Sequence, residues 1–377
     1  MNKNEISEIK RLFTKERCCI TRMAGCYVNA EKEKVMQFKE PFLSLPEEEM
    51  YKYLDIFRKA FSGAIGKNLL NLEFPLDEEM GDGTQKQLLA LRDGELKEDN
   101  DLDAFYDQVI ETWYHPENYL ILLIHGAYDI PAKASDGFEM EDASDYVYSF
   151  ILCCLCPVEL SKAGLCYNAE TNSFRDRIRD WMVGMPEQAF LFPAFNDRNT
   201  DLHNLLFYSK NAKEFCEEMI EQFLGCTRPL PAAQQKESFQ AIIEDALGDA
   251  CVYDAVLRIH DTLNEMIEEK SDDPEPLELD KADVRRLLER CGAPEENMER
   301  FEQDYDEEIG AQATVMASHI SDTKTFEVKT PEVTVKVQAD CADMVETRMV
   351  DGVPCLVIPL TNEVMVNGIR VKQKVEE

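Results

Sequence analysis

The residues most able to do chemistry in this sequence are polar side chains at the ends of long apolar runs. His125 follows the apolar run 119–124, and Asp129 comes four residues later. Open α/β sheets place ligands beyond the ends of buried parallel strands. An active site is therefore expected at His125 and Asp129 if the protein is an enzyme. The sequence favours the alternative, a histidine at a strand end whose ring is hydrogen-bonded within the protein.

A second polar group lies between the apolar runs 189–195 and 202–208. It contains Asp197, Arg198 and His203. With Lys162 they are the candidate neighbours of a site where strand ends meet. A surface turn with local ion pairs accounts for the same residues without any chemistry.

The thirteen cysteines are expected to be structural. The run 153–156 contains a C-x-x-C pattern, but it ends an apolar stretch and no second pair lies at zinc-ligand spacing. Redox cysteines need a helix N-terminus to lower the thiol pKa, and Pro157 follows this run instead. We expect no disulfides, no bound metal and no cofactor, because complete phosphate-loop, Rossmann and hydrolase motifs are also missing from the sequence.

Charge is distributed in two acidic blocks. The net charge is −35, and the segments 61–160 and 231–310 each contribute −16. Such surfaces attract basic proteins and repel phosphate backbones. The leading hypothesis is therefore a binding or regulatory protein that acts on a basic partner. A solvated acidic face that binds nothing is the alternative.

Two further charged segments have simple interpretations. Arg175, Arg177 and Arg179 alternate with Asp176 and Asp180, which predicts a self-neutralising helix face. The helix pair expected over 280–309 resembles a helix-turn-helix in layout, but acids dominate its second helix. Direct nucleic-acid binding by 280–309 is therefore excluded.

These segments belong to an expected α+β architecture in three parts. The sequence of residues 1–230 predicts a mixed sheet-and-helix domain. Its buried strands are expected at 119–124, 146–156, 189–195 and 202–208. Residues 231–310 predict an acidic helical segment, in which a long helix bends at Gly248 and a later one begins at Asp280 and ends at Gly292. Residues 311–377 predict a small β-meander with turns at Asp351-Gly352 and Asn367-Gly368 and a bulge or break at Pro331.

The expected location is the cytoplasm. The N-terminal segment has no apolar stretch typical of a secretory signal. The longest uncharged apolar run, 146–158, is far shorter than the roughly 20 residues that a membrane helix needs. We therefore expect no membrane association.

Several sequence segments are similar to those of an uncharacterised bacterial family, found mainly in Firmicutes and known as a domain of unknown function. They are GKNLLNLEF (66–74), CPVELSKAGLCYN (156–168), FLFPAFNDRNTDLHNLLFYSKN (190–211) and VETRMVDGVPCLVIPL (345–360). The resemblance covers nearly the whole chain. It implies a cytoplasmic bacterial protein and no particular activity, cofactor or catalytic residue.

Overall fold

The chain forms two compact units, Met1–Ala232 and Ala233–Glu377. The computed structural model describes residues 1–76, 81, 83–133, 139–213, 215–311, 313–321, 325–359, 364–366 and 369–371. The sequence predicted three parts, and its first boundary lies two residues from the observed one. Within the second unit, β13 (Glu278–Leu279) in the helical region pairs with β14 (Val315–Met316), across the second predicted boundary.

The first unit is built on one large antiparallel sheet. Every ladder between its strands is antiparallel in the part of the chain that the structure describes. The predicted buried runs lie in four of these strands, β4, β5, β9 and β12. The strand order is β2 (Lys34–Pro41), β1 (Ile20–Val28), β4 (Tyr119–Lys133), β5 (Glu139–Leu160), β9 (Gln188–Phe192), β12 (Asn204–Ser209) and β3 (Leu69–Glu73), with β8 (Trp181–Val183) paired to the far end of β5.

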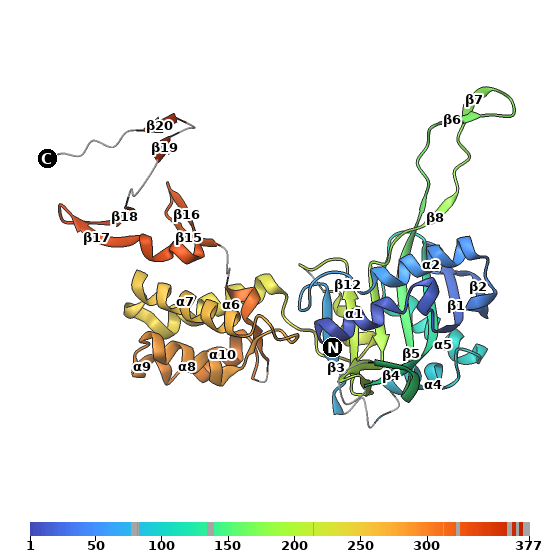
Figure 1. Ribbon diagram of the computed structural model, residues 1–377, viewed down its shortest axis with the longest axis horizontal. Coiled ribbons are helices and arrows are strands. Elements are labelled where there is room, and N and C mark those ends of the chain that lie inside the picture. Colours follow the sequence, from blue (N-terminus) through green and yellow to red (C-terminus); the bar gives the residue numbers. More distant parts are fainter. Residues whose placement is uncertain are drawn as a thin grey trace. The chain divides into compact units, whose positions relative to one another are not determined.

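Helices cover both faces of this sheet (Figure 1). One face packs against α1 (Lys3–Arg11) and α2 (Glu47–Lys59), and the other against α4 (Thr84–Asp93), α5 (Asp99–Thr112) and the π-helical η3 (Glu218–Phe223). Burial on both faces explains why the central strands are apolar without alternation.

Side chains along each central strand alternate between two separate cores. The cross-strand pair Leu122 and Cys154 belongs to the core beneath α1 and α2. The next pair, Leu123 and Cys153, belongs to the core beneath α4 and α5. Two layers of helix around one sheet therefore give the first unit two hydrophobic cores.

One close approach in the central ladder requires glycine. Gly126 on β4 faces Phe150 on β5. A Cβ at residue 126 would lie 2.4 Å from the Phe150 ring, which is closer than van der Waals contact. The ring packs across the strand because residue 126 has no side chain.

The second unit begins with a layer of helices. They are α6 (Ala232–Leu247), α7 (Tyr253–Glu269), α8 (Lys281–Cys291), α9 (Glu295–Met298) and α10 (Phe301–Glu308). The break at Gly248, which has a φ of +50°, lies where the pattern predicted it. Asp280 forms a capping box with Asp283, and Gly292 ends α8 in the left-handed conformation.

Three separate hairpins follow instead of one continuous meander. They pair β15 (Thr325–Lys329) with β16 (Thr334–Gln338), β17 (Glu346–Val350) with β18 (Val353–Val357), and β19 (Val364–Val366) with β20 (Ile369–Val371). Asp351-Gly352 is the left-handed turn of the second hairpin, and the break at Pro331 is the turn of the first. Asn367-Gly368 lies outside the described residues.

A long β-hairpin extends from the first unit (Figure 1). It continues from β5 and β8 to a tip formed by β6 (Leu165–Asn168) and β7 (Ser173–Asp176). We call residues 161–183 the arm. The arginine run lies on it, so the prediction of a helix face there was wrong. A strand of this sequence places the arginines on one face and the aspartates on the other, and a run of six residues is too short to distinguish a strand from a helix.

Candidate functional site

His125 lies inside the central sheet. It occupies the middle of β4, between β1 and β5, and is only 4% exposed. Its Nδ1 lies 2.6 Å from the Thr21 hydroxyl and its Nε2 lies 2.9 Å from the Ser149 hydroxyl. Burial lowers the pKa of its ring. The parallel-strand argument for His125 fails, because the sheet is antiparallel and β4 continues for eight residues past it.

The other predicted site residues are not gathered around this ring. Asp129 is exposed further along β4. Lys162 is exposed on the arm, eleven residues beyond Ile151, the β5 partner of His125, or about 36 Å along the strand. His203 is exposed just before β12, which is three strand spacings from β4, or about 14 Å. Lys162 and His203 are therefore too far away to share a site with His125.

Asp197 and Arg198 form the tight turn between β10 (Ala194–Asn196) and β11 (Asn199–Asp201). Both have left-handed φ angles, 51° and 55°. The Asp197 amide donates to Glu5 at 2.7 Å, and the Arg198 guanidinium lies 3.1 Å from Glu8. These contacts fasten the turn to α1, which is a structural role.

A side chain next to Asp129 reaches this turn through Glu8. The Tyr128 hydroxyl donates to Glu8 at 2.9 Å, so Tyr128 and Arg198 share one carboxylate. Burial, with the Glu8 contact, raises the pKa of Tyr128 to about 12. The structure thus connects the two predicted polar groups, although through residues that the sequence patterns did not indicate.

A cleft lies elsewhere, at the end of the sheet where β9 begins and β12 ends. We call it the cleft; its volume is about 660 Å³. Tyr114 supplies exposed aromatic surface, with Trp113 and Phe215 buried beneath the lining, and carboxylates and two cations supply charge. Its polar lining residues are Glu187, Gln188, Ser209, Lys210, Asn211, Cys216, Glu217, Glu218 and Arg228.

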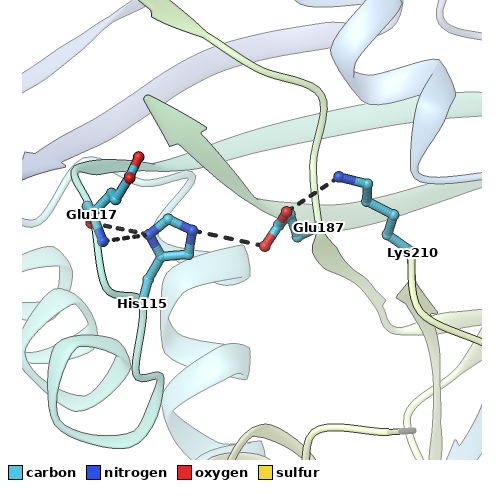
Figure 2. Close-up of polar contacts among 4 residues, drawn as sticks. All are labelled: His115, Glu117, Glu187 and Lys210. Atoms are coloured by element: carbon cyan, nitrogen blue, oxygen red, sulfur yellow. Dashed lines mark hydrogen bonds and ion pairs between the residues drawn. The ribbon is translucent and has the colours of Figure 1, made fainter. Parts of the chain in front are cut away.

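Figure 2 shows a cluster of His115, Glu187 and Lys210, of which Glu187 and Lys210 line the cleft. Glu187 accepts from Lys210 at 3.2 Å and lies 3.7 Å from His115 Nε2. His115 Nδ1 lies 2.9 Å from the Glu117 carbonyl oxygen and 3.2 Å from the Glu117 amide. The Nδ1 atom accepts from the amide in one tautomer and donates to the carbonyl in the other. The cluster therefore places one carboxylate between an imidazole and an ammonium group.

Other charged and polar side chains of the cleft form ion pairs and hydrogen bonds with neighbouring residues. Arg228 lies 3.5 Å from Glu217 and 3.6 Å from Glu221, and the Cys216 thiol donates to Glu218 at 3.3 Å. Burial raises the pKa of the Cys216 thiol, so this group is a poor nucleophile near neutral pH. Aromatic surface with carboxylates at its rim suits a cationic or aromatic side chain better than an anion.

The C-x-x-C run lies within the buried part of β5. Cys153, Cys154 and Cys156 are fully buried, and burial raises the pKa of each thiol. Cys153 faces one core and its neighbours face the other, so the three do not converge. Within the described ranges, no three His, Cys, Asp or Glu side chains are grouped as metal ligands.

The second unit carries a continuous set of exposed carboxylates on α9 and α10. Met298, Phe301 and Tyr305 are buried on the inner side of these helices. Of the outer carboxylates, Glu302 pairs with Arg285 at 3.0 Å and Asp306 pairs with Lys281. We call the outer set the acidic helical surface: Glu295, Glu296, Glu299, Glu302, Asp306, Glu307 and Glu308.

These features define an α+β protein in which an antiparallel sheet between two helical layers precedes acidic helices and small hairpins. No helix among the described residues is both long and apolar enough to cross a bilayer. The chain belongs to the family of the domain of unknown function DUF4317, whose family model matches residues 1–369. The resemblance to a family of unknown function over nearly the whole chain is thereby confirmed. No curated protein matches the chain.

Proposed function

We propose that the protein is a cytoplasmic binding protein that recognises a basic protein partner through the acidic helical surface. The observation that carries this proposal is the exposure of seven carboxylates along α9 and α10, whose inner side holds three buried side chains. Only two of the seven have an ion-pair partner among the described residues. Such a surface raises the local concentration of basic proteins and speeds their association.

The proposal is tested by neutralising charge without changing shape. Four carboxylates of the surface become amides in the variant Glu295→Gln, Glu296→Gln, Glu299→Gln and Glu307→Gln. A matched control makes the same change at four exposed glutamates of the first unit: Glu16, Glu31, Glu73 and Glu111. Both variants change the net charge by the same amount, so a difference between them reports position and not total charge.

The partner is captured from a native lysate on the immobilised chain, identified, and then purified for titration. Exposed ion pairs contribute about 0.2–1 kcal/mol each, so four should weaken binding about 4- to 800-fold. We expect this loss in the surface variant, little loss in the control, and release of the partner between about 0.05 and 0.5 M salt. Equal losses in both variants, or binding that is unaffected by salt, would contradict the proposal.

An enzyme acting at His125 is the second hypothesis. Its ring would have to be reached by a substrate, yet the ring is enclosed by Thr21 and Ser149. Carbethoxylation of the native protein, followed by peptide mass spectrometry, tests access directly. Rapid modification of His125 at the rate of the exposed His203 would favour the enzyme.

A further inference from the structure

The arm is a two-stranded β-hairpin whose structure suits contact with another molecule. Hydrogen bonds join its two strands at intervals, from Ser161 with Asp180 at 2.8 Å to Arg177 with Gly164 at 2.8 Å. The tip continues with four paired residues on each strand. A two-stranded hairpin is marginally stable alone in water. A segment of this kind gains stability when another surface covers it.

Apolar side chains gather on the arm and are exposed there. At the tip, Tyr167 pairs with Phe174, with ring centroids 5.7 Å apart, and Leu165 lies two residues away on the same face. These three side chains are 57%, 73% and 77% exposed. Ile178, Trp181, Met182 and Val183 add further exposed apolar surface towards the base. The three tip side chains are adjacent, and an exposed apolar patch of this kind marks a contact site for a macromolecule.

The charge of the arm indicates which kind of partner surface it can bind. The arm contains four cationic and three anionic residues, a net of +1, so the rest of the chain carries −36. Arg175 and Arg177 are exposed, and no ion pair joins either of them to a carboxylate among the described residues. Arginine and large aromatic residues are the types that dominate binding energy at protein interfaces. The arm therefore fits a surface that combines apolar groups with carboxylates.

The cleft is a surface of this composition, and it lies at the base of the arm. Glu187 and Gln188 line it, only four residues beyond the end of the arm. The arm extends ten residues from this base to its turn, or about 33 Å, and so its tip lies far from its own cleft. A second copy can present its cleft to the tip. Because each copy carries the cleft at the base of its arm, two arms lying side by side in opposite directions would each reach the other copy's cleft.

We propose that two copies of this chain form a two-fold dimer by exchanging arms, with the arm tip of each copy docked in the cleft of the other. Phe174 and Tyr167 then contact Tyr114 of the partner copy's cleft. Arg175, which pairs with Cys166 on the opposite face of the ribbon, approaches the carboxylates of that cleft from the other face. A ribbon about 33 Å long and about 10 Å wide offers roughly 330 Å² per face. Both faces and the cleft together reach the roughly 800 Å² per partner that stable complexes bury.

Sedimentation velocity of the full chain, from about 1 to 100 μM at about 0.15 M salt, tests the proposal. We expect a dimer for the natural chain. An arm variant, Tyr167→Ser with Phe174→Ser and Arg175→Glu, should weaken dimerisation at least about 100-fold, because it removes two anchors of about 2 kcal/mol each. A cleft variant, Tyr114→Ser with Glu217→Arg, should also be monomeric. The control Val35→Ser with Leu43→Ser changes exposed apolar residues elsewhere on the unit and should remain dimeric.

Mixing the two monomeric variants gives the sharper test. The arm variant keeps an intact cleft and the cleft variant keeps an intact arm, so an equimolar mixture should form a dimer with one working contact. A natural chain that is monomeric at about 100 μM would refute the proposal. A dimer that survives the arm substitutions, or a mixture that stays monomeric, would also refute it. Arm-dependent binding to a DNA duplex or to phosphatidylglycerol vesicles, with no dimer, would assign the arm to a different partner.

Discussion

Replacing His125 by alanine should destabilise the first unit by about 3–4 kcal/mol. The substitution removes two hydrogen bonds, to Thr21 and Ser149, each of which contributes about 1 kcal/mol. His125 is only 4% exposed, so removing its ring also leaves a small cavity. This cavity adds about 1–2 kcal/mol to the loss of stability. The matched control is His203→Ala, because His203 is exposed and such changes stay within about 0.5 kcal/mol. Urea unfolding measures both variants.

The pH dependence separates loss of the ring from a general loss of packing. Burial lowers the pKa of His125 in the folded state below the value near 6.5 of an unfolded chain. Its contribution to stability is therefore fully present above about pH 6.5 and declines as pH falls, because the unfolded chain takes up the proton first. The stability gap between the natural chain and His125→Ala should narrow from pH 7.5 to pH 5.5. A gap that widens, or an equal loss in His203→Ala, would refute this account of a buried, neutral, hydrogen-bonded ring.

Three further predictions follow from the packing. Gly126→Ala should lower the free energy of unfolding by about 1–3 kcal/mol, because its Cβ would meet the Phe150 ring. Gly164→Ala on the arm has open space around it and should leave the free energy of unfolding nearly unchanged. Denaturant titration compares the two variants, and equal effects would contradict the ladder geometry. Alkylation at pH 8 should label the exposed Cys251 and spare Cys153 and Cys154 until the protein unfolds, as peptide mass spectrometry can show; early labelling of the pair would contradict their burial. Limited proteolysis should cut first in the connection 227–236 between the units or in the arm turn 169–172, and first cleavage inside 119–124 would contradict the described division.

Local patterns predicted the elements of this protein well. The apolar runs became β4, β5, β9 and β12 because burial on two faces demands continuous apolar sequence. Asp280 and Gly292 marked the limits of α8 because a cap and a left-handed residue act within one turn. Such signals depend on neighbours in sequence and can be read without knowing the fold.

The cleft could not be predicted in the same way. His115 precedes β4, Glu187 precedes β9, and Lys210 follows β12, so their proximity depends on strand order and direction. The sequence does not state either one. His125 was a predicted site residue because it ends an apolar run, yet β4 continues past it with both polar and apolar residues. The assumption of parallel strands then placed a site where an antiparallel ladder encloses a ring.

The alternation of side chains between two cores has a consequence for how this family can vary. Cys153 and Cys154 are adjacent in sequence but pack with different sets of residues. Substitutions at such neighbours should have additive effects on stability, because they share few contacts. Each face of the sheet can then accumulate compensating changes with its own helices, while the other face is unaffected. An insertion of one residue within β5 is a different matter, since it would exchange the two sets of side chains at once. Relatives should therefore differ freely in core composition and hardly at all in the length of this strand.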